Sequence, residues 1–111
     1  MRLAYIVEAL YFSWELDMNL EKSKKRIAKK VKMGFQGYPK ITLEYYGGTA
    51  NHASEVLVTF ILEEGKEPLE ERFSSKSDVR EDEVIQSAIV KMIERTEARS
   101  VSQVEGVSLI I

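Results

Sequence analysis

The chain has 111 residues, of which 44% are hydrophobic and 31% are charged, and its formal net charge is −2. These values are typical of one globular domain with an ordinary apolar core, so we expect residues 1–111 to form a single domain. The absence of cysteine excludes disulfide bonds, thiolate metal sites and cysteine nucleophiles. No apolar run reaches transmembrane length and no signal-peptide pattern is evident, so we expect a cytoplasmic protein without a membrane role.

The charged residues are unevenly distributed along the chain. Residues 1–42 hold nine basic and four acidic residues, which gives +5, whereas residues 43–111 hold seven basic and fourteen acidic residues, which gives −7. Such a chain can neutralise itself internally, pair with a second copy, or present its basic part to an anion.

Residues 2–16 are dense in aromatic and β-branched residues, and two periodicities fit them almost equally well. Alternation with period two places six apolar residues on one face: Ala4, Ile6, Leu10, Phe12, Trp14 and Leu16. A period of 3.6 places four on one stripe: Leu3, Val7, Leu10 and Trp14. The residue types favour a strand, which we predict; helix is the alternative, because fifteen residues without a turn signal are long for a strand.

The segment Leu20–Met33 (LEKSKKRIAKKVKM) is predicted to form an amphipathic helix. Asp17 or Asn19 is expected to cap its start, and Gly34 to end it. Seven basic residues lie in this segment, and five of them are our candidates for binding an anion or nucleic-acid phosphates: Lys22, Lys25, Arg26, Lys29 and Lys32. A neighbouring sheet carrying Tyr38, Tyr45 and Tyr46 would add surfaces on which bases stack.

Three strands are predicted between residues 41 and 74. Ile41–Tyr46 alternates with period two, Glu55–Leu62 is the most apolar segment and should be central, and Leu69–Ser74 carries charges suited to a sheet edge. The glycines and small polar residues at 47–54 predict a loop between the first two.

Asp78 is predicted to open a second helix, with Glu81 three residues later completing a capping box. We expect this helix and the central strand to bury one common core: Val56, Val58, Phe60, Val84, Ala88, Ile89 and Met92. Val101–Ile111 is predicted to form the last strand, with a bulge at Gly106. The predicted order is therefore β-α-β-β-β-α-β, and the predicted fold class is α+β, a single mixed or antiparallel sheet with two helices on one face.

The order of elements over residues 20–97 resembles that of double-stranded RNA-binding domains, and with the first strand it resembles that of ribosome-hibernation factors. His52, in a loop before a strand, adds to the first resemblance. In the RNA-binding family the last helix opens with a lysine-rich turn that holds phosphates. Here residues 77–83 (SDVREDE) are acidic and would repel phosphates, so we carry over no functional residue from either family.

No group of residues in the sequence resembles a catalytic site. His52 is the only histidine and lies in a polar loop, and the Gly47-Gly48 pair lacks the spacing of a phosphate-binding loop. Acidic pairs and runs such as Glu63-Glu64 are best explained by solubility, edge protection and helix capping. We therefore expect no catalytic, cofactor-binding or metal-binding residues, and no enzyme activity.

These features favour a non-enzymatic binding or regulatory module that acts through protein contacts, either as a homodimer or with another protein. The terminal segments hold more apolar residues than one small core needs, so the expected interface includes Trp14, Leu109, Ile110 and Ile111. The alternative function is nucleic-acid binding through the basic helix 20–33.

Overall fold

The computed structural model describes residues 19–110. These residues form two helices, a short 3₁₀ turn and four strands: α2 (Leu20–Lys32), β1 (Lys40–Gly47), β2 (Glu55–Ile61), β3 (Leu69–Ser74), η1 (Val79–Glu81), α3 (Glu83–Arg95) and β4 (Ser100–Leu109). The α+β class is confirmed. The order is α-β-β-β-α-β rather than the seven-element order that we predicted. The expected first element, over residues 2–16, lies outside the described residues, as does Ile111.

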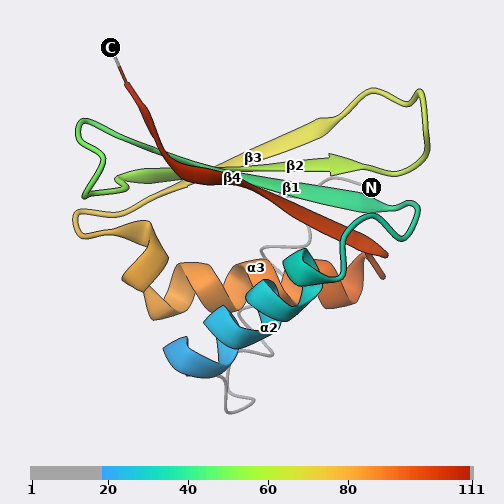
Figure 1. Cartoon of the computed structure of the whole chain (residues 1–111), viewed down its shortest axis with the longest axis horizontal. Coiled ribbons are helices and arrows are strands. Elements are labelled where there is room, and N and C mark those ends of the chain that lie inside the picture. The colour runs from blue at the N-terminus through green and yellow to red at the C-terminus, as the bar shows by residue number, and fades with distance from the viewer. Residues whose placement is uncertain (1–18, 111) are drawn as a thin grey trace.

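The four strands form one mixed sheet in the order β3-β2-β1-β4. The β1–β2 and β2–β3 pairs are antiparallel, whereas β4 lies parallel to β1. Figure 1 shows that α2 and α3 lie together on one face of this sheet, as predicted. The prediction that β2 is central and β3 is an edge strand is also confirmed.

The core lies between the sheet and the helices. Strands β1 and β2 bury every second residue, because successive side chains of a strand point to opposite faces. Five of the seven predicted core residues are buried, and Ala88 is half-buried at the edge of the same cluster. Val84 was predicted wrongly, since its side chain is 58% exposed. The buried stripe of α3 is centred on Ile89 and Met92, and a helix turns about 100° per residue, which directs Val84 away from the sheet.

The start of α3 also differs from the prediction. Asp78 caps only the turn η1, and Asp82 caps α3 by accepting a hydrogen bond from the backbone N–H of Ile85 (3.1 Å). Asp82 between the two is extended (φ −92°, ψ 111°), so η1 and α3 do not form one continuous helix. The turn η1 is held against the β1–β2 loop, where the N–H of Val79 donates to the carbonyl oxygen of Ala53 (2.8 Å) and Val79 is fully buried.

Helix α2 begins and ends as the sequence indicates. Asn19 accepts a hydrogen bond from the N–H of Lys22 (2.9 Å), and Gly34 has the positive φ of 73° that commonly ends a helix. Ser23, which no pattern in the sequence singled out, is fully buried, and its Oγ lies 3.1 Å from Oγ of Ser87 on α3. Because both side chains are small and hydrogen-bond each other, α2 and α3 can lie close together at this point.

The pairing of β1 with β4 contains the predicted bulge. The register between the two strands shifts between Leu43 and Tyr45, and Gly106 has a φ of 73°. At the far end of β1, Gly47 is required for a different reason, because a Cβ atom there would collide with the carbonyl oxygen of His52.

The contrast between Phe60 and Val84 tests this description of the core. Phe60→Ala should lower the free energy of unfolding by about 3–5 kcal/mol, because it leaves a cavity in a packed core. Val84→Ala should change it by no more than about 0.5 kcal/mol, because the side chain is mostly in water. Denaturant unfolding of both variants measures the difference; equal losses would show that the core is placed wrongly.

Candidate functional site

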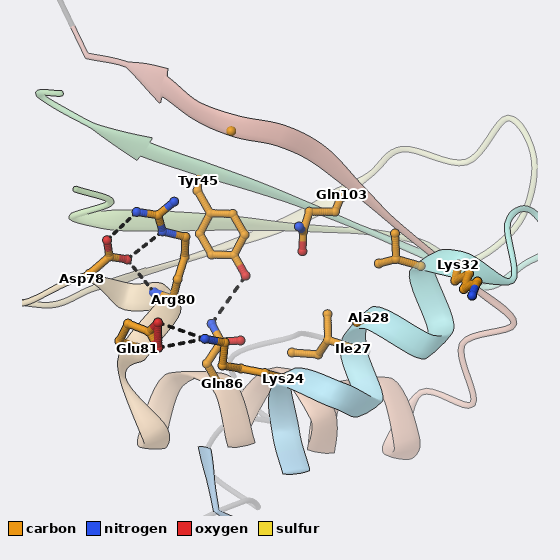
Figure 2. Close-up of a pocket in the computed structure, with 12 residues that line it drawn as sticks. Lys24, Ile27, Ala28, Lys32, Tyr45, Asp78, Arg80, Glu81, Gln86 and Gln103 are labelled. Atoms are coloured by element: carbon orange, nitrogen blue, oxygen red, sulfur yellow. Dashed lines mark hydrogen bonds and ion pairs between the residues drawn. The ribbon is translucent and has the colours of Figure 1, made fainter. Parts of the chain in front are cut away.

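A groove of about 540 Å³ lies between α2 and the sheet, beside the register shift between β1 and β4. Figure 2 shows α2 forming one wall with Ile27 and Ala28, Tyr45 pointing in from β1, and the charged side chains of the η1 region at one end. The lining residues are Lys24, Ile27, Ala28, Val31, Lys32, Tyr45, Asp78, Arg80, Glu81, Gln86, Gln103 and Gly106.

A paired aspartate and arginine form the charged end of the groove. Arg80 donates to Asp78 through Nε (2.9 Å to Oδ1) and through Nη2 (2.6 Å to Oδ2), and the N–H of Ala53 donates to Oδ2 (3.1 Å). The side-chain hydrogen bonds from Arg80, with the backbone N–H groups of Arg80 and Ala53, hold the pKa of Asp78 far below its usual value of 3.8. The hydrogen bonds to the Asp78 carboxylate raise the pKa of Arg80.

The other polar groups around this end are also paired. Lys24 Nζ lies 2.9 Å from Oε2 of Glu81, and this hydrogen bond raises the pKa of Lys24. Burial raises the pKa of Tyr45, whose hydroxyl accepts a hydrogen bond from Nε2 of Gln86 (3.4 Å). This arrangement joins η1, α2, α3 and β1, which is the geometry of a structural connection between elements.

The structure divides the cations of α2 into two groups. Lys24, Arg26 and Lys30 bond to the rest of the fold: Lys24 to Glu81, Arg26 to Glu94 (3.4 Å), and Lys30 to the carbonyl oxygen of Ala98 (3.4 Å). The exposed residues Lys22, Lys25, Lys29 and Lys32 follow one another at spacings of three, four and three residues, so they form one line along the outer surface of the helix. Four of the five candidate anion ligands are therefore brought together, whereas Arg26 points toward α3.

Two of the three tyrosines expected to stack bases lie away from this line. Tyr45 is buried against the helices. Tyr46 lies on the opposite face of the sheet, where the guanidinium of Arg72 is 5.3 Å from its ring centroid. Tyr38, past the end of α2, packs edge-on against Phe35 (5.4 Å between centroids). The structure thus separates Tyr45 and Tyr46 from the phosphate-binding part of the predicted nucleic-acid site.

The predicted interface residues lie at the end of β4. Leu109 is 58% exposed and Ile110 is 51% exposed. Trp14 and Ile111, the other two candidates, lie outside the described residues. On the uncovered face of the sheet, Thr42 pairs with Ser102 (3.0 Å) and Ser108 pairs with Glu44 (2.8 Å).

Residues 19–110 contain no cluster of three or more His, Cys, Asp and Glu side chains placed to hold a metal ion. No helix within that range is long and apolar enough to cross a membrane. His52 is exposed in the β1–β2 loop. The Asp78–Arg80 pair was not identified from the sequence, although their separation of two residues is a detectable signal; Tyr45 and Gln86 are 41 residues apart, and no local pattern connects them.

Comparison of the chain with protein-family models, curated proteins and solved structures gave no match.

The Asp78–Arg80 pair should make the free energy of unfolding fall as the solution becomes acidic. A carboxylate whose folded pKa is lowered stabilises the fold above its unfolded pKa and loses that contribution as the pH falls. Asp78→Asn should therefore lower the free energy of unfolding at about pH 7. The variant's free energy of unfolding should also change less than that of the wild type between about pH 7 and about pH 3. Denaturant unfolding at both pH values measures this, with Glu67→Gln in the exposed β2–β3 loop as the matched control. The same pH dependence in Asp78→Asn and wild type would contradict it.

Proposed function

We propose that this protein is a non-enzymatic binding or regulatory module that acts through protein contacts, and that it self-associates as a homodimer through the outer edge of β4. The observation that carries the proposal is the combination of an unpaired strand edge with exposed apolar side chains at Leu109 and Ile110. Within residues 19–110, no strand pairs with this side of β4.

The two edges of the sheet differ in a way that favours association through β4. Strand β3 carries Glu70, Glu71 and Arg72 in six residues and follows Pro68, which are features that discourage pairing with another chain. Strand β4 has ten residues and one charge, Glu105. An edge of this length with few charges is a template for a further strand.

The backbone of β4 provides the groups that pairing requires. The N–H of Ile110 donates to the carbonyl oxygen of Gly47 (2.9 Å), so this residue faces β1. In a strand, backbone groups of alternate residues point to opposite sides, and those of Val107 and Leu109 therefore point away from β1. They can exchange hydrogen bonds with an incoming strand without disturbing the sheet.

A second copy of the chain is the partner that this edge suits best. Antiparallel pairing of the C-terminal part of β4 with its own copy, around a two-fold axis near Leu109, places the same residues on both sides, so Leu109 of each subunit would lie beside its counterpart. The result would be a continuous sheet of eight strands, twice the four in one subunit. Both of its ends would be charged β3 strands, which would stop assembly at the dimer.

Placing a charge on the β4 edge tests the proposal. Sedimentation of the full chain at micromolar concentration should show a dimer. Leu109→Lys should give a monomer, because like charges would meet at the two-fold axis. The matched control is Leu69→Lys, the same substitution at an exposed leucine of the opposite edge strand, which should leave the dimer intact.

Two outcomes would overturn the proposed dimer. One is a wild-type chain that sediments as a monomer, and the other is a dimer that Leu109→Lys leaves unchanged. Thermal unfolding of both variants confirms that each remains folded, so that loss of the dimer is not mistaken for loss of the fold.

A further inference from the structure

A row of three exposed lysines on α2 is the strongest charged feature that the proposed dimer does not use. Lys25, Lys29 and Lys32 all lie on the surface, and Lys22 continues their line. Within the described part of the chain, Lys25, Lys29 and Lys32 form no ion pair, whereas Lys24 and Arg26 of the same helix do. We infer that Lys25, Lys29 and Lys32 bind the phosphate backbone of a double-stranded nucleic acid.

The packing of α2 explains why these lysines face solvent. Ser23 and Ile27 are buried against α3 and the sheet, and they define the inner side of the helix. Residues 25, 29 and 32 fall on the opposite side at about 100° per residue, although Lys32 also reaches the rim of the groove. Glu21 is the only acidic residue in α2. The line therefore projects positive charge away from the fold.

Six acidic residues lie on α2, η1, α3 or their N-caps, and two of these, Glu81 and Glu94, are paired with Lys24 and Arg26. A further group of acidic residues lies in the sheet layer. Glu63, Glu64, Glu67, Glu70 and Glu71 belong to the β2–β3 hairpin, and Figure 1 shows this hairpin in the sheet layer while α2 lies in the helix layer. A net charge of −2 is thus compatible with a basic outer face on α2. Separation of charge on this scale can attract a polyanion to one side of the molecule.

The length of the row matches the spacing of phosphates along a nucleic-acid strand. Seven residues separate Lys25 from Lys32, which is about 10 Å along the helix axis at ~1.5 Å per residue. A strand of a duplex advances about 3.4 Å along its axis per phosphate, so the same length presents roughly three phosphates to three lysines.

The composition of this face favours a duplex over single strands or a membrane. Single strands are usually bound on aromatic platforms, but Tyr45 is buried and Tyr46 lies on the other face of the sheet, and the exposed Phe35 packs edge-on against Tyr38 rather than in a flat stack. A helix on a membrane surface inserts an apolar face, and the apolar face of α2 is packed in the core. Contacts to phosphates alone carry no base recognition, so binding should be independent of sequence.

Salt dependence provides the test. Fluorescence anisotropy with short mixed-sequence DNA and RNA duplexes should show binding at low ionic strength that weakens as salt rises, because bound phosphates release counterions. In Lys25→Gln with Lys29→Gln, the slope of log affinity against log salt should fall by about 2, since each phosphate contact contributes ~0.9. The matched control is Lys66→Gln with Lys76→Gln, which removes the same charge from two exposed loop lysines and should leave the slope unchanged.

The arms of this experiment separate the alternatives. Binding to either duplex supports the inference, and the tighter of the two identifies DNA or RNA as the source of the phosphates. Three results would overturn it: no salt-sensitive binding to either duplex, the same loss in the loop variant, or tighter binding to single strands or to poly-glutamate. Because Leu109 is not altered, the outcome is independent of the proposed dimer.

Discussion

The fold depends on the burial of β1 between two strands and beneath two helices. Strand β1 pairs with β2 on one side and with β4 on the other, and its residues Ile41, Leu43 and Tyr45 are buried in the core. Apolar burial of this kind is the main favourable term in folding. Because β1 is interior, β3 and β4 become the two edges of the sheet, and the position of every surface described above follows from that arrangement.

The same packing decides how α2 presents its charges. Ile27 and Ser23 set the inner side of the helix, which leaves Lys24 and Arg26 beside acidic groups of η1 and α3 and directs Lys25, Lys29 and Lys32 outward. Exposed ion pairs such as Lys24–Glu81 contribute little to stability, at most about 1 kcal/mol. In α2 these ion pairs neutralise the charge on one side of the helix, and a row of cations remains on the other side.

Local patterns in the sequence predicted much of the fold. The alternation in β1 and β2, the cap at Asn19, the helix end at Gly34 and the bulge at Gly106 are all confirmed, because each depends on neighbouring residues. The predicted start of α3 was wrong, because Asp82 is extended and interrupts the helix, while Val79 is held by Ala53, 26 residues away, through a contact that no local capping pattern encodes. Of the candidate site, the row of lysines was predictable from helical spacing, and the groove was not.

The sequence by itself determined the periodicities, the caps and the uneven distribution of charge, since all of these are properties of neighbouring residues. Only the tertiary structure decided which cations of α2 are paired, which edge of the sheet carries charges and which carries few, and that Tyr45 and Tyr46 lie apart from the basic face. The physical reason is distance along the chain. Lys24 meets Glu81 across 57 residues and Arg26 meets Glu94 across 68, and no local pattern encodes which distant residues packing brings together.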